Sequence, residues 1–131
     1  MNNEYFLNMH WKLWIENGIF RARIFAEKVD LSIVETGVRE RVRLCEGTIF
    51  PMLSDLRKMK HVDQEARAFL AKPESTVFIN AGAFLVNSQL QKILGNFFIL
   101  IDKPGIPTRL FTDEAEALAW LQQFKNIRST A

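Results

Sequence analysis

Apolar residues recur at every second position near the start of the chain and at every third or fourth position further on. Over residues 5–16 the alternation is strict, which is typical of a β-strand with one face on a core. Asn17 and Gly18 follow, and this pair favours a type I′ turn because both central residues of that turn need positive φ. We therefore expect a second strand over residues 19–25, antiparallel to the first.

Beyond the hairpin, helical patterns alternate with short apolar runs that are typical of buried strands. Helices are expected over about 31–46, 63–71, 88–101 and 113–124, and strands over 48–53, 81–86 and 108–111. The order of elements is ββαβαβαβα. It predicts right-handed crossovers and an α/β fold, with a mostly parallel five-stranded sheet opened by the antiparallel hairpin and four helices. A single domain over residues 1–131 fits this pattern.

The composition limits which classes of protein, and which kinds of partner, are compatible with the sequence. Of the 131 residues, 48% are hydrophobic and 24% are charged, as in ordinary globular domains. The net charge is only +2, and charges of both signs are interspersed, so the sequence gives no support to a nucleic-acid partner. One cysteine, no basic leader and no long apolar run favour a cytoplasmic protein without a transmembrane segment.

The last third of the chain carries a resemblance to a known family. It rests on Asn96-Phe97-Phe98, on Lys103-Pro104, on the run from Pro107 to Phe111 (Pro-Thr-Arg-Leu-Phe), and on residues 113–121 (Asp-Glu-Ala-Glu-Ala-Leu-Ala-Trp-Leu). Together with the order of elements, these segments resemble the SpoIIAA-like (STAS/SEC14-type) domain family of bacteria. The resemblance implies a SpoIIAA-like fold. The best understood relatives are anti-sigma-factor antagonists, which bind a kinase and are switched by serine phosphorylation, and other relatives are similar to lipid carriers.

Ser54 is the nearest counterpart of the serine that the antagonists phosphorylate, although no glycine follows it here. Asp55 and Arg57 lie beside it, just past a predicted strand, where open α/β sheets tend to bind ligands. These three residues form a candidate switch or ligand site. In the alternative interpretation, Asp55 or Ser54 only caps the next turn by accepting hydrogen bonds from backbone N–H groups.

The sequence offers no recognisable catalytic, cofactor or metal site. His10 and His61 have no cysteine or second histidine at ligand spacing, and Cys45 lies on the apolar stripe of the first helix. There is no Ser-His-Asp or Cys-His arrangement, and no glycine-rich phosphate loop. We therefore expect a protein that is not an enzyme and needs no cofactor.

Two pairs of aromatic residues suggest binding surfaces. Phe6 and Trp14 alternate onto the polar face of the first strand, where they need a cover, and they form a candidate homodimer interface. Phe97 and Phe98 widen the apolar face of the helix at 88–101. They belong either to the core or to a lid over an apolar pocket.

Two functional hypotheses follow. The first is a regulatory or protein-interaction module that binds an unknown protein partner, or a second copy, through a surface that includes the hairpin. The alternative is a protein that binds a lipid or another apolar small ligand in a cavity under the helix at 88–101. The second hypothesis predicts a sizeable enclosed pocket lined by Phe97 or Phe98, and a solidly packed interior would exclude it.

Overall fold

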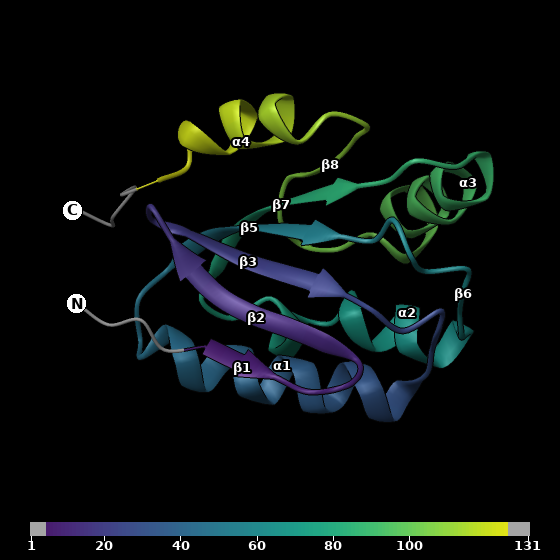
Figure 1. Ribbon diagram of the computed structural model, residues 1–131, viewed down its shortest axis with the longest axis horizontal. Coiled ribbons are helices and arrows are strands. Elements are labelled where there is room, and N and C mark those ends of the chain that lie inside the picture. The colour runs from purple at the N-terminus through teal and green to yellow at the C-terminus, as the bar shows by residue number, and fades with distance from the viewer. Residues whose placement is uncertain (1–4, 126–131) are drawn as a thin grey trace.

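The computed structural model describes residues 5–125, in which a twisted sheet separates two layers of helices (Figure 1). The main sheet has the order β1-β2-β3-β5-β7-β8. Its strands are β1 (Tyr5–Leu7), β2 (Trp11–Glu16), β3 (Ile19–Ile24), β5 (Phe50–Asp55), β7 (Ile79–Leu85) and β8 (Thr108–Phe111). Two further strands, β4 (Lys28–Val29) and β6 (His61–Val62), form a small parallel sheet of their own.

The helices connect the parallel strands. They are α1 (Leu31–Cys45), α2 (Gln64–Leu70), α3 (Gln89–Phe97) and α4 (Glu114–Gln122), with a 3-10 turn at Pro73–Ser75 and a π-helical segment at Phe98–Asp102 that continues α3. The ladders from β3 to β8 are parallel, and those joining β1, β2 and β3 are antiparallel. The predicted architecture, a mostly parallel sheet opened by an antiparallel hairpin, is confirmed. The main sheet has one strand more than expected, and the small β4-β6 sheet was not predicted.

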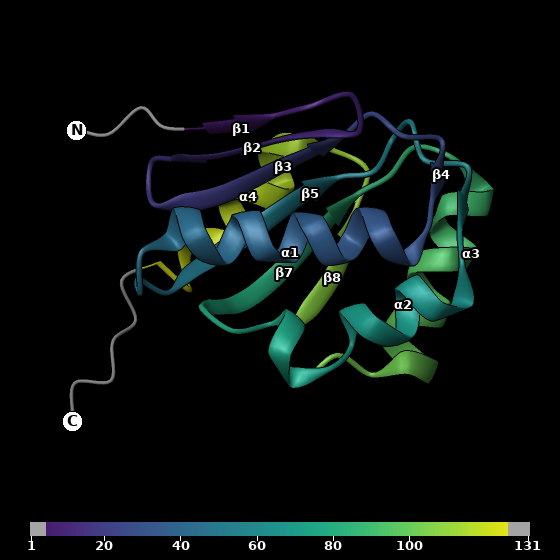
Figure 2. The ribbon, with the colours of Figure 1, turned by 90° about the horizontal axis from the view of Figure 1, so that it is seen from below.

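The two layers of helices differ in extent. Helices α1, α2 and α3 cover one face of the sheet, and α4 alone lies on the other (Figures 1 and 2). The α4 helix packs on β5 and β7, and β8 lies beside it. On the α4 side of the sheet, Ile19 at the start of β3 packs in the cluster under α4. The area beyond it, over β1, β2 and the rest of β3, extends past this helix, and we call this area the open face.

The extra strand arises because the first predicted strand, 5–16, is interrupted. The side chain of Asn8 accepts hydrogen bonds from the backbone N–H groups of His10 (2.7 Å) and Trp11 (3.0 Å), which makes a turn. β1 then folds back on β2 with Phe6 opposite Leu13, and Phe6 packs against the core on the α1 side. The expectation that Phe6 and Trp14 share an outer face is wrong. The turn at Asn8 reverses the chain and places Phe6 on the core side of the sheet, opposite to the side of Trp14.

Most of the other boundaries follow their local signals. Asn17 and Gly18 have φ values of 54° and 76°, as a type I′ turn requires. Asp30 caps α1 by accepting from Ile33 N (2.9 Å). The ladder of β5 with β7 has a register shift between Phe50 and Pro51, as suits a proline, which cannot donate a ladder hydrogen bond. Hydrogen bonds and backbone angles of individual residues thus fix where these helices and strands begin and end.

Candidate functional site

An apolar cavity of about 210 Å³ lies between the sheet and the layer formed by α1, α2 and α3. Three neighbouring strands each place a small residue in its floor, Ala22 on β3, Ser54 on β5 and Gly82 on β7. Ala22 lies opposite Ser54, and Gly82 lies opposite Met52, two residues earlier on β5. An engineered cavity of about 150 Å³ in another protein binds benzene, so this one has room for a small organic molecule.

Helix α3 forms the roof over one side of the cavity. Leu94, Gly95 and Phe98 line the cavity, and Phe98 packs against Phe84 with ring centroids 5.6 Å apart. A Cβ atom on Gly95 would lie 2.6 Å from a methyl carbon of Leu110, so a larger residue here would require the Leu110 side chain to move.

The structure separates the two phenylalanines that were expected to act together. Phe98 is 8% exposed and lies in the cavity wall, whereas Phe97 is 44% exposed and lies outside it. Adjacent residues of a helix point about 100° apart, so both could not face the same cavity. Phe98 therefore lines an apolar pocket under this helix and Phe97 does not, while ligand binding there stays a prediction.

The candidate switch residues do not form one site, because successive residues of β5 point to opposite faces. Ser54 lines the cavity, and its hydroxyl has no hydrogen-bond partner within residues 5–125. Asp55 faces the other way and accepts two hydrogen bonds from the Arg57 guanidinium, at 2.9 and 2.7 Å. Phosphorylation of Ser54 stays a prediction, but Asp55 and Arg57 do not share its surroundings.

Asp55 has the structural role that the alternative interpretation gave it. Its carboxylate also accepts from the backbone N–H of Arg57 (3.1 Å), which closes the turn after β5. Burial on its own would raise the pKa of the Asp55 carboxyl, but the hydrogen bonds from Arg57 and the charges of Arg57 and Arg23 together hold this pKa below its ordinary value.

Arg41 is a buried cation in the cavity wall that the sequence analysis did not single out. It is 2% exposed, and its guanidinium donates to the carbonyl oxygens of Val77 (2.7 Å) and Ser75 (2.8 Å). Burial lowers the pKa of Arg41, and burial also raises the pKa of the neighbouring Cys45 thiol despite the nearby positive charge. The signal was present in the sequence, because Arg41 lies seven residues after Val34 and four before Cys45, on the apolar stripe.

Polar contacts also fix α3 at both ends. Near its start, Gln91 is 4% exposed, and its amide donates to the carbonyl oxygens of Arg57 (2.8 Å) and Met59 (2.9 Å). Just past its end, Arg67 from α2 donates to Asp102 (2.9 Å), and both side chains are largely buried. The roof of the cavity is thus attached by hydrogen bonds as well as by apolar packing.

Two donors on the cavity wall have no partner. Trp11 Nε1 and Arg67 Nε are buried and make no hydrogen bond within the part of the chain that the structure describes. Buried donors in native proteins are rarely left unpaired, so these two groups need an explanation. The hydroxyl of Ser54, which is only partly buried, is a further donor on the same wall.

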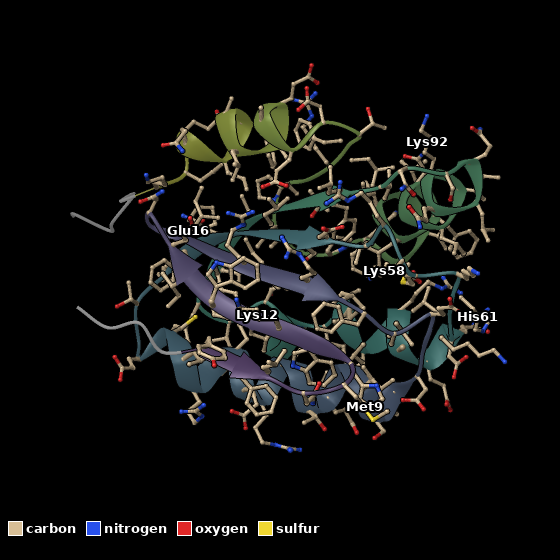
Figure 3. The ribbon with its side chains drawn as sticks, viewed as in Figure 1. Met9, Lys12, Glu16, Lys58, His61 and Lys92 are labelled. Carbon is tan, nitrogen blue, oxygen red and sulfur yellow. The ribbon has the colours of Figure 1, made fainter. Side chains whose placement is uncertain are left out.

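The open face of the sheet carries Trp14 among three cations. The distances to the Trp14 ring centroid are 4.9 Å from Lys12 Nζ, 5.3 Å from the Arg21 guanidinium carbon and 5.5 Å from that of Arg23. Trp14 Nε1 donates to Glu16 (2.9 Å). Lys12 lies over the middle of β2 and Glu16 lies near its end in Figure 3.

Within residues 5–125, no three side chains of histidine, cysteine, aspartate or glutamate come together as a metal site would require. His61 pairs with Asp63 at 2.9 Å, and His10 lies against the ring of Trp11. The same part of the chain contains no helix long and apolar enough to cross a membrane.

Comparisons with known proteins place the chain in a family and a fold. Residues 13–125 match the family described as Domain of unknown function DUF7793. The structure is similar to that of an uncharacterised DUF3478-family protein with a SpoIIAA-like fold from Shewanella loihica PV-4, with 16% identity and a TM-score of 0.67 over 92% of this chain and 98% of that one. No curated protein matches the sequence. The chain therefore belongs to the DUF7793 family, and its fold is SpoIIAA-like, as the sequence predicted.

Proposed function

We propose that the protein binds a small, uncharged, apolar molecule in the cavity between the sheet and helices α1, α2 and α3. The observation that carries this proposal is a cavity of about 210 Å³ in a wall made mostly of apolar side chains. Protein interiors are close-packed and contain few voids larger than a water molecule. Binding sites for small molecules are typically concave and mostly apolar, and an apolar molecule that fills this space would remove apolar wall surface from water.

The charged groups of the wall argue for a neutral ligand. The terminal nitrogens of Arg41 donate to backbone carbonyl oxygens, and the charge of Arg67 is balanced by Asp102. The buried wall atoms without a partner in the described chain, Trp11 Nε1 and Arg67 Nε, are both donors. They favour an apolar molecule that carries a hydrogen-bond acceptor, such as a ketone or an ester.

Binding can be tested with a neutral fluorescent probe, 1-aminoanthracene, and two competitors of the same shape. Fluorenone and fluorene differ in one carbonyl group, and we expect fluorenone to displace the probe at the lower concentration. Ala22→Leu, which fills the floor of the cavity, should abolish probe binding. Lys12→Leu places the same leucine side chain on the open face, away from the cavity, and should leave probe binding unchanged. If Ala22→Leu folds and binds the probe as the wild type does, the proposal is wrong.

A second candidate function is self-association through the open face. The observation that favours it is the order of side chains on β2, where Lys12, Trp14 and Glu16 follow one another on this face. A two-fold axis through Trp14 would set Lys12 of one copy against Glu16 of the other, which makes the surface complementary to itself. Sedimentation velocity should then detect a dimer that Trp14→Ala weakens and that Lys12→Glu abolishes. A monomer at all concentrations would exclude this candidate.

A further inference from the structure

The outer side of α3 and of its π-helical continuation exposes a continuous apolar stripe. Half of the ten large hydrophobic residues that are exposed within residues 5–125 lie on this segment. We call them the outer stripe, and they are Leu90, Ile93, Phe97, Leu100 and Ile101. They recur at three- and four-residue intervals, so they share one side of the helix. Leu100 and Ile101 are 66% and 61% exposed.

The packing of the domain does not use this stripe. The opposite side of the same helix is the one that covers the cavity, through Leu94, Gly95 and Phe98. The Arg67 guanidinium carbon lies 4.5 Å from the centroid of the Phe97 ring, and this ring is still 44% exposed. A cluster of large apolar side chains that the fold leaves uncovered marks a site of interaction with another surface.

The charges around the outer stripe indicate which kind of surface would bind it. Residues 87–107 contain two lysines, Lys92 and Lys103, and a single acidic residue, Asp102. Asp102 is already paired with Arg67, whereas neither lysine lies within ion-pair distance of a carboxylate in the described chain. The stripe is therefore bordered by free positive charge, and Lys92 projects from α3 into solvent (Figure 3). Apolar side chains bordered by lysines are the composition of helices that lie in the interface of anionic membranes.

We propose that the outer stripe, with Lys92 and Lys103, docks the protein on the surface of an anionic membrane. The segment from Gln89 to Asp102 is too short to span a bilayer, which takes about 20 residues, so it would lie flat in the interface. A second copy is a less suitable occupant, because two stripes face to face would bring these lysines together with no free carboxylate to meet them. This inference goes beyond ligand binding in the cavity and does not depend on it.

Vesicle flotation tests the inference directly. The protein should float with vesicles of phosphatidylcholine and phosphatidylglycerol, should float less with phosphatidylcholine alone, and should be released by salt. The double variant Leu100→Glu/Ile101→Glu should lower the partition coefficient by roughly tenfold or more, since it removes two inserting side chains. Lys92→Glu/Lys103→Glu should lower it on the anionic vesicles only.

The matched control is Leu7→Glu/Met9→Glu, which makes the same change at two exposed residues at the start of the hairpin. It should bind vesicles as the wild type does, and thermal melts should show that all variants fold. The inference is overturned if the wild type binds no vesicles, or if Leu100→Glu/Ile101→Glu binds as well as the wild type. It is also overturned if the wild type is a dimer that this variant turns into a monomer. Probe binding in the absence of vesicles tests the cavity separately, so the two proposals can fail independently.

Discussion

Small residues lie on both faces of the central sheet, but they allow close packing on one face and border a cavity on the other. On the face under α4, Ala81 and Ala83 of β7 lie against Ala117 and Leu121, and all four are fully buried. On the other face, Ala22, Ser54 and Gly82 form the floor of the cavity. A small side chain thus permits close packing where one helix lies directly on the sheet. Where three helices span the sheet, the small side chains of the floor leave a space instead.

The largest expected effect tests the close-packed face. Leu121→Ala should lower the free energy of unfolding by about 2–5 kcal/mol, because Leu121 is fully buried and its neighbours on the sheet are alanines that cannot fill the gap. Urea denaturation measures the change. A loss below about 1 kcal/mol would show that α4 is not closely packed on the sheet, and the contrast between the two faces would fail.

The same substitution on each face gives the most direct comparison. Ala83→Leu adds bulk under α4 and should lower the free energy of unfolding by about 1–3 kcal/mol. Ala22→Leu adds equal bulk to the cavity and should leave the stability unchanged or raise it. Melting temperatures of the two variants provide the measurement. Equal destabilisation by both would mean that the cavity floor has no room for a side chain.

A smaller effect concerns how the cavity roof is attached. Asp102→Asn replaces a charged hydrogen bond to Arg67 with a neutral one and should lower the free energy of unfolding by about 1 kcal/mol. The loss should be local, so hydrogen exchange should speed up in the segment 98–103 and not in α4. Faster exchange throughout the domain would contradict this assignment.

The smallest effect depends on pH. The lowered pKa of Asp55 means that its ionised form stabilises the fold above its ordinary value of 3.8, and that this contribution is lost as the pH falls through the folded-state pKa. Asp55→Asn should therefore cost less than about 1 kcal/mol at neutral pH, because Arg57 is partly exposed. The difference from the wild type should disappear in acid, as urea denaturation over a series of pH values would show. A difference that persists there would exclude the ion pair as its cause.

Elements with strong local signals could be predicted from the sequence. Asn17-Gly18 gave the hairpin, Asp113 capped the last helix by accepting from Ala115 N (2.8 Å), and the strand at 108–111 lies where it was expected. Asn8 was missed because alternation continues on both sides of it, and only its side-chain hydrogen bonds show that the strand turns back.

The cavity was harder to foresee in detail. A pocket under the helix at 88–101 was one of two hypotheses for its aromatic residues, but its floor depends on Ala22, Ser54 and Gly82, which are far apart in sequence. Strand order and register bring these three together, and a local pattern contains neither. Arg41 was overlooked because a charged residue on an apolar stripe is usually expected to reach solvent.

The π-helical segment at Phe98–Asp102 contains one residue more than an ordinary α-helical turn. It is closed by the backbone N–H of Lys103, which donates to the carbonyl oxygen of Phe98, five residues earlier (2.9 Å). A deletion of one residue between them would let the same turn close as α-helix, so the loop leading to β8 would still begin in nearly the same direction. We therefore expect a one-residue deletion to be tolerated better in this turn than in the regular turns of α3.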